Sequence, residues 1–160
     1  MFWEEKIERM KTKFTQNEFR VPFSDRSEIM KKMEARFVIS SKPAYQNTNW
    51  SEGLKERVVL RKIAYEAIPP AISTLDPAAN YWVVIVLGDA SMAQQLIYDC
   101  KPAALVQLVA IAPGNFFIGD KKYRWLVYFN MNRPENTVTM IKAGSSSTPL
   151  DSFNPDFTSN

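Results

Sequence analysis

Residues 115–130, NFFIGDKKYRWLVYFN, decide the fold of this 160-residue chain. Two aromatic segments flank a charged Gly-Asp-Lys-Lys stretch, a pattern typical of two β-strands joined by a turn. Alternation in the second segment predicts one wholly apolar face and one mixed face. The apolar set is Tyr123, Trp125, Val127 and Phe129, and the residues between them are Arg124, Leu126 and Tyr128. We therefore predict a β-hairpin that is covered by the core on one side.

Strand signals continue on both sides of this hairpin. Residues 81–87, YWVVIVL, lack polar alternation, which predicts a strand covered on both faces. A turn is expected at 88–90, and residues 94–99 predict a strand that pairs back on the first. After a polar turn over 130–136, residues 137–143 predict a last strand. The sheet should therefore contain about five strands, antiparallel or mixed.

One apolar helix is expected between the strands of this half. Pro102 suits a first helical turn, Leu105, Leu108 and Val109 repeat at helical spacing, and Pro113-Gly114 stops the pattern. Nearly every side chain is apolar, so the helix should be deeply buried. The run ALVQLVAIA also permits a strand, which is the principal alternative.

The first half of the chain predicts three helices. The first lies within residues 1–17, where apolar side chains recur every three or four positions, and docking on the domain's own core is favoured over a coiled coil or an interfacial anchor. The second runs from about Asp25 to Val38, with Asp25 as a candidate N-cap. A loop over 40–49 leads to a third helix that begins near Trp50 and ends before two prolines. The apolar residues of the first helix are Trp3, Ile7, Met10 and Phe14.

Together these elements predict a single α+β domain over residues 1–144, in which N-terminal helices pack on the sheet. Residues 145–160 are rich in Ser, Pro and Asn, which is typical of a flexible C-terminal tail. The longest apolar runs fall short of the roughly 20 residues that a membrane-spanning helix needs, and no export signal is visible. We expect a cytoplasmic protein without a membrane partner.

The composition excludes several kinds of chemistry. The chain has no histidine, which removes the commonest general base and metal ligand. Its single cysteine, Cys100, can form no internal disulfide and no cysteine-rich metal site. Nucleotide and hydrolase motifs are absent. We therefore expect no enzyme, cofactor or metal, and a formal charge of only +3 makes nucleic acid an unlikely partner.

Charged residues at or near the predicted turns are candidate sites. Carboxylates at or near these turns are expected to bind backbone amides rather than to catalyse. They are Asp89, Asp99, Asp120 and Glu135. Lys121, Lys122 and Arg124 form a compact positive spot at the hairpin tip, which either contacts phosphate or an acidic protein surface, or only keeps the hairpin solvated, and the last is favoured.

The hairpin resembles one in a bacterial family of uncharacterised domains with the pattern YIVDKKYxWLL, followed by an Asn and usually two histidines. The matching residues are Phe117, Ile118, Asp120, Lys121, Lys122, Tyr123, Trp125, Leu126 and Asn130. Met131 and Asn132 replace the histidine pair, so the resemblance does not extend to any role of those histidines. Residues 49–55, NWSEGLK, are similar to the family's WxExLK helix start.

Domains of this sort resemble small bacterial immunity proteins, including the SUKH-type group. The resemblance implies a protein that binds a cognate toxin and blocks its active site, with a partner-binding surface rich in charge and aromatic anchors. The candidate partner-binding residues are Lys121, Lys122, Arg124, Tyr128 and Arg133. Two alternatives stay open: a small-ligand or nucleic-acid binding module around Tyr128 and Arg124, and an enzyme that uses carboxylates and tyrosines.

Overall fold

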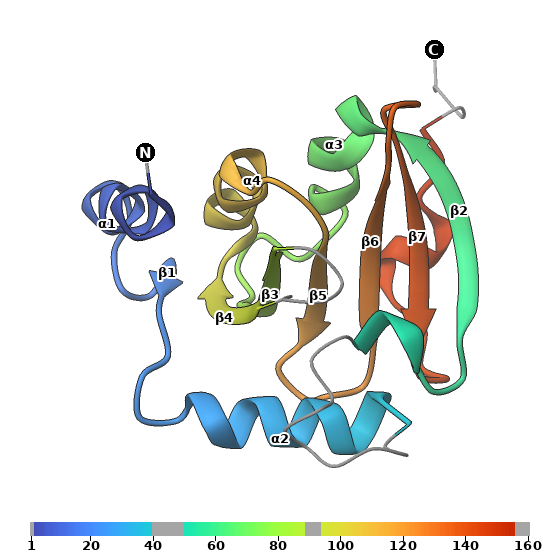
Figure 1. Ribbon diagram of the computed structural model, residues 1–160, viewed down its shortest axis with the longest axis horizontal. Helices are drawn as coiled ribbons and strands as arrows, with labels where there is room; N and C mark the ends of the chain where they lie inside the picture. The colour runs from blue at the N-terminus through green and yellow to red at the C-terminus, as the bar shows by residue number, and fades with distance from the viewer. Residues whose placement is uncertain (1, 40–49, 89–93, 156–160) are drawn as a thin grey trace.

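A computed structural model describes residues 2–39, 50–88 and 94–155, and within them it forms a seven-stranded antiparallel sheet (Figure 1). The strand order is β1-β4-β3-β5-β6-β7-β2, and each pair of neighbours is antiparallel. The strands are β1 (Phe19–Arg20), β2 (Val58–Ala64), β3 (Tyr81–Leu87), β4 (Gln94–Cys100), β5 (Phe116–Asp120), β6 (Leu126–Asn132) and β7 (Thr137–Ala143).

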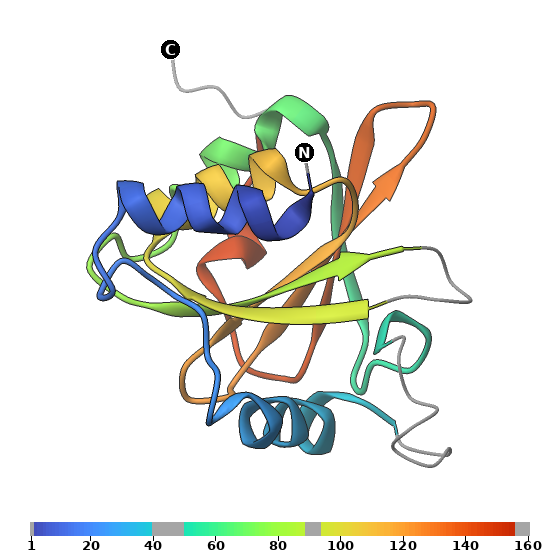
Figure 2. The same ribbon diagram turned by 60° about the vertical axis from the view of Figure 1, so that its left-hand side comes forward.

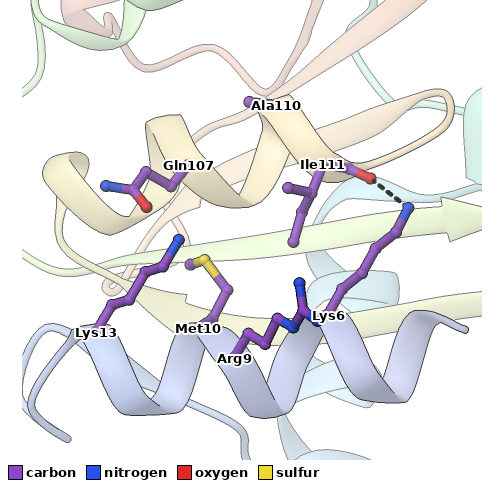
Figure 3. Close-up of a pocket in the computed structure, with 7 residues that line it drawn as sticks. All are labelled: Lys6, Arg9, Met10, Lys13, Gln107, Ala110 and Ile111. Atoms are coloured by element: carbon purple, nitrogen blue, oxygen red, sulfur yellow. Dashed lines mark hydrogen bonds between the residues drawn. The ribbon is translucent and has the colours of Figure 1, made fainter. Parts of the chain in front are cut away.

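Helices cover both faces of the sheet (Figure 2). One face carries α1, α3 and α4, and the other carries α2 and the short 3-10 helix η2. Helix α1 lies beside α4, where Lys6 Nζ donates to the carbonyl oxygen of Ile111 at 3.3 Å (Figure 3). The α-helices are α1 (Trp3–Lys13), α2 (Arg26–Phe37), α3 (Ile68–Ile72) and α4 (Pro102–Ile111), and the 3-10 helices are η2 (Trp50–Glu52), η3 (Tyr65–Ala67) and η4 (Pro149–Ser152).

The aromatic hairpin is buried on both faces, so the prediction of one mixed face is wrong. Phe116 pairs with Phe129 across β5 and β6, and their rings stack at 4.6 Å on the α1 and α4 side. Phe117 pairs with Tyr128, and these rings stack at 4.5 Å on the α2 side. Tyr123, expected in the strand, lies in the turn with a φ of 55°. The second face is buried because α2 covers it, and Arg124, which made the expected face mixed, lies in the turn before β6.

The α+β class is confirmed, as are the predicted elements at α1, α2, β3, β4 and β7. Residues 102–111 form a helix and not a strand. Only one side of that helix is buried, with Leu105 and Leu108 inside and Gln107 exposed, so the prediction of deep burial is wrong. An apolar composition does not bury a helix all round when it lies in an outer layer over a sheet.

The predicted third helix is wrong. After η2, residues 58–64 form the edge strand β2, which pairs with β7 and has a register shift between Val59 and Arg61. Pairing with a strand far along the chain outweighs the local helical pattern. Pro69 and Pro70 lie in the first turn of α3 and do not end a helix. Proline fits there because the backbone N–H groups of a first turn have no partner within the helix.

The expected count of about five strands is therefore too low, because β1 and β2 were not predicted as strands. Strand β1 contains only two residues, which is too short for an alternation to be visible in the sequence. The loop predicted over 40–49 and most of the turn predicted at 88–90 lie outside the described residues.

Contacts with the domain extend past the expected boundary at residue 144. Leu150 in η4 is 0% exposed and lies in the core on the α1, α3 and α4 side. Thr148 and Asp151 form a reciprocal capping box at the start of η4. Lys142 Nζ donates to Asp151 Oδ2 at 3.2 Å, and the Arg61 guanidinium donates to the Asp151 carbonyl oxygen at 3.1 Å.

Leu150→Ala should lower the free energy of unfolding by about 2 kcal/mol, because it leaves a cavity under η4. Urea denaturation followed by circular dichroism measures the change, with Ser152→Ala as the control at an exposed position of the same helix. Equal midpoints and slopes for the two variants would contradict the docking of η4.

Candidate interaction surface

The cations predicted at the hairpin tip are held by carboxylates of the protein itself. Lys121 Nζ lies 2.7 Å from Asp99 Oδ2 and 3.5 Å from the centroid of the Trp82 ring. Arg124 Nε lies 2.6 Å from Asp120 Oδ2. Asp120 Oδ1 accepts the backbone N–H groups of Arg124 and Trp125, so this carboxylate also orders the turn. Both cations are partly neutralised before any partner arrives.

The other three predicted residues lie in different settings. Lys122 is exposed and has no ion-pair partner in the described ranges. Tyr128 is buried against Phe117, and burial raises the pKa of its hydroxyl. Arg133 lies beyond the far end of β6, where its guanidinium donates to the Pro113 carbonyl oxygen at 3.2 Å. The structure therefore brings Lys121, Lys122 and Arg124 together and separates Tyr128 and Arg133 from them.

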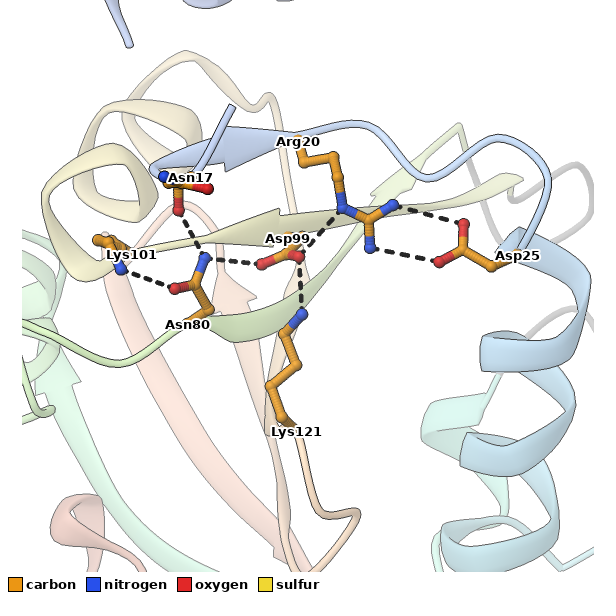
Figure 4. Close-up of polar contacts among 7 residues, drawn as sticks. All are labelled: Asn17, Arg20, Asp25, Asn80, Asp99, Lys101 and Lys121. Carbon is orange, nitrogen blue, oxygen red and sulfur yellow. Dashed lines mark hydrogen bonds and ion pairs between the residues drawn. The ribbon is translucent and has the colours of Figure 1, made fainter. Parts of the chain in front are cut away.

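Asp99 of β4 is the centre of a polar network that joins β1 and β4 to the residues just before β3 and just after β5 (Figure 4). Its side chain is 10% exposed, and it accepts from Arg20 Nε at 3.3 Å, from Lys121 Nζ at 2.7 Å and from Asn80 Nδ2 at 2.9 Å. Asn80 Oδ1 in turn accepts from Lys101 Nζ at 2.8 Å. A carboxylate this buried needs such compensation, since an unpaired buried charge is costly.

The same network closes a loop over residues 20–25, which we call the Phe23 loop. The Arg20 guanidinium donates to both carboxylate oxygens of Asp25, at 3.5 and 3.3 Å, and this bond lowers the pKa of Asp25 (Figure 4). Between these ends Pro22 is buried, whereas Phe23 is 94% exposed. The loop thus holds an aromatic ring out in solvent on a braced backbone.

A hollow of about 430 Å³ lies beside Phe23. Phe14, Phe19 and Val21 give it an apolar wall, and Lys11 and Arg20 line its charged side. An exposed aromatic ring next to a partly apolar hollow is a feature that protein interfaces use for anchoring.

The hairpin tip, the Phe23 loop and α2 adjoin one another (Figures 1 and 2). Lys121 bonds the carboxylate that also holds Arg20 of the loop. Tyr123 in the turn lies under Lys32 Nζ of α2 at 5.9 Å, and its carbonyl oxygen accepts from Arg36 Nε at 3.2 Å. We call the region where these three elements meet the Phe23 surface. It comprises Phe23, Lys32 and Lys121, and Lys122 and Arg124 lie beside it in the hairpin tip.

Sequence reasoning missed Phe23 and expected of Asp99, at the end of a predicted strand, only the backbone hydrogen bonds typical of turns. A phenylalanine between Pro22 and Ser24, outside any helical or strand period, was the available signal for exposure. Asp99 lies inside β4, and no local pattern identifies its partners, which come from β1 and the β5–β6 turn. The turn role expected for Asp120 is observed. Asp89 lies outside the described residues.

Two features of the described residues concern metal binding and cysteine reactivity. No group of three or more His, Cys, Asp or Glu side chains in them could hold a metal ion. Cys100 is buried, and burial raises the pKa of its thiol well above the ordinary value, which suppresses the nucleophilic thiolate. No helix in these ranges combines the length and apolar character needed to cross a membrane.

Comparison with models of protein families gives no match, and neither do comparisons with curated proteins and with solved structures. The resemblance to immunity-type domains therefore stays a prediction, and a proposal about function rests on the features of the Phe23 surface.

Proposed function

We propose that the protein is an immunity-type inhibitor that binds a cognate protein toxin in the bacterial cytoplasm, and that the Phe23 surface is its docking face. The observation that carries the proposal is the 94% exposure of Phe23 on a loop braced at both ends. When a partner removes so exposed an apolar ring from water, the free energy of the complex falls, which favours binding.

The hydrogen bonds of Arg20 hold the Phe23 loop in one conformation before binding, which favours a protein partner. Arg20 is bonded to Asp25 within the loop and to Asp99 in β4, so residues on both sides of Phe23 are fixed before binding. A preordered anchor loses less conformational entropy on association, which increases affinity. A small molecule would instead be expected in a concave site, whereas Phe23 projects outward.

The exposed charges of the hairpin tip, beside the Phe23 surface, suit a partner with acidic groups at its rim. Lys122 is exposed and unpaired in the described ranges, and the Arg124 side chain is 60% exposed although it bonds Asp120. Rim charges of this kind mainly raise the association rate and set specificity. We propose that the toxin supplies carboxylates opposite Lys122 and Arg124 and that binding there covers its active site.

Phe23→Ala should weaken the complex about tenfold to hundredfold, the effect typical of an anchor residue. The experiment co-expresses the chain with the product of the adjacent gene, scores rescue from toxicity and then measures affinity by isothermal titration calorimetry. Phe2→Ala is the matched control, because Phe2 is also exposed, at 76%, but lies at the start of α1.

Equal affinities for the two variants would remove Phe23 from the interface. If the wild-type chain neither rescues growth nor forms a complex, the toxin-inhibitor proposal fails. Salt-dependent binding of a generic oligonucleotide that Phe23→Ala abolishes would point to the nucleic-acid alternative instead.

A further inference from the structure

The groove between α1 and α4 is a second feature with the character of a binding site (Figure 3). It has a volume of about 350 Å³. Lys6, Arg9 and Lys13 of α1 line one wall, Gln107 of α4 lines the other, and Met10 and Ile111 supply apolar surface between them. No acidic side chain lines it.

Two of the three cations are available to a ligand. Lys6 is engaged, since its ammonium group donates to the Ile111 carbonyl oxygen at the C-terminal end of α4, where a cation also balances the helix dipole. Arg9 and Lys13 are exposed and make no ion pair with any described residue. The acid nearest to them in sequence, Glu8, pairs with Lys11, so it does not neutralise the groove.

The spacing of the cations favours an elongated ligand over a small anion. Positions 6, 9 and 13 follow one face of α1 and span about 10 Å along its axis. Figure 3 shows Lys6 and Lys13 at opposite ends of the groove, directed toward different parts of α4. Cations arranged in a row match carboxylates arranged in a row, whereas a single phosphate would need them to converge.

We propose that the α1–α4 groove binds an acidic amphipathic helix of a partner protein. Carboxylates three and four residues apart on such a helix would meet Arg9 and Lys13, and an apolar side chain between them would cover Met10 and Ile111. A nucleic acid would extend its phosphates beyond the groove past Glu4 and Glu5 on the same α1, which would repel them, whereas a short acidic helix can stay within the groove. The groove lies on the sheet face away from α2, so this inference does not rest on the toxin-inhibitor proposal.

The test uses the full chain and a fluorescein-labelled helical peptide of about 14 residues, or four turns, with Glu at every third or fourth position and Leu and Ala between. Fluorescence anisotropy at low salt should show binding of this peptide and at least tenfold weaker binding of the same peptide with Gln in place of Glu. Arg9→Glu combined with Lys13→Glu should weaken binding at least tenfold.

Arg57→Glu together with Lys31→Glu is the matched control, because Arg57 and Lys31 are exposed and distant from the groove in sequence. This control and Phe23→Ala should each bind the Glu peptide as the wild type does, and thermal unfolding should show that both double variants fold. The inference is overturned if the Glu peptide does not bind, if the Gln peptide binds equally well, or if both double variants lose binding alike. Tighter binding of a generic oligonucleotide that Arg9→Glu with Lys13→Glu abolishes would overturn it too.

Discussion

Replacing Phe117 with alanine is expected to lower the free energy of unfolding by about 4 kcal/mol. Phe117 is 1% exposed in the middle of β5 and contacts two further rings, Tyr128 at 4.5 Å and Trp50 at 5.6 Å between centroids. Truncation removes the apolar surface of the ring and both aromatic contacts. The backbone on either side is fixed by pairing with β3 and β6, so the sheet cannot collapse into the cavity.

Urea denaturation followed by circular dichroism and by tryptophan fluorescence measures this loss. Phe2→Ala makes the same chemical change at an exposed position and should leave the midpoint almost unchanged. A Phe117→Leu variant, which keeps part of the volume, should fall between the two. If Phe117→Ala were no more destabilised than Phe2→Ala, the packing of α2 and η2 on this face of the sheet would be wrong.

Elements whose pattern is set by local spacing could be predicted from the sequence. Helix α1 follows from apolar residues at helical intervals, and β3 follows from an uninterrupted β-branched run. Strand β2 could not be predicted, because Arg61 and Lys62 with nearby glutamates produce a helix-like pattern. Its strand conformation depends on hydrogen bonds to β7, whose residues lie far away in the chain. Pairing between distant segments therefore leaves no strand periodicity in the sequence of β2.

The candidate site was predictable only in part, for the same reason. Lys121, Lys122 and Arg124 are adjacent in sequence, so their common position at the hairpin tip follows from the turn. Their ion-pair state does not, since Asp99 reaches Lys121 only through the antiparallel placement of β4 and β5 on the two sides of β3. Tyr128 was expected on a mixed face, and the position of α2 decides instead that it is buried.

Asp99→Asn is expected to lower the free energy of unfolding by about 3 kcal/mol. The amide oxygen can still accept from Asn80, which bonds Asp99 Oδ1. The amide NH2 group then replaces Oδ2, so it faces the donors of Arg20 and Lys121. We place the loss at the lower end of the range for buried ion pairs, because the Arg20 and Lys121 side chains are 38% and 32% exposed and water can partly solvate them.

Glu135→Gln is the matched control for this substitution, because it makes the same chemical change in an ion pair that water already solvates. Lys62 Nζ and Glu135 Oε2 are 2.9 Å apart, yet both side chains are more than half exposed. Such pairs contribute little to stability, so the control should unfold close to the wild type. Comparable losses in the two variants would show that burial does not set the strength of the Asp99 network.

A second substitution tests whether the loss in Asp99→Asn comes from the cationic donors that face its side chain. Lys121→Met removes one of the two cations and should make Asp99→Asn less costly, because fewer donors then face the amide. Native-state hydrogen exchange measures the effect on individual strands. Asp99→Asn should speed exchange in β1, because the two residues of β1 pair only with β4 in the described sheet. Since Arg20 also bonds Asp25, this loosening should extend to the Phe23 loop and weaken its brace. Strictly additive losses and unchanged exchange in β1 would instead mean that Asp99 stabilises the strands without ordering the docking loop.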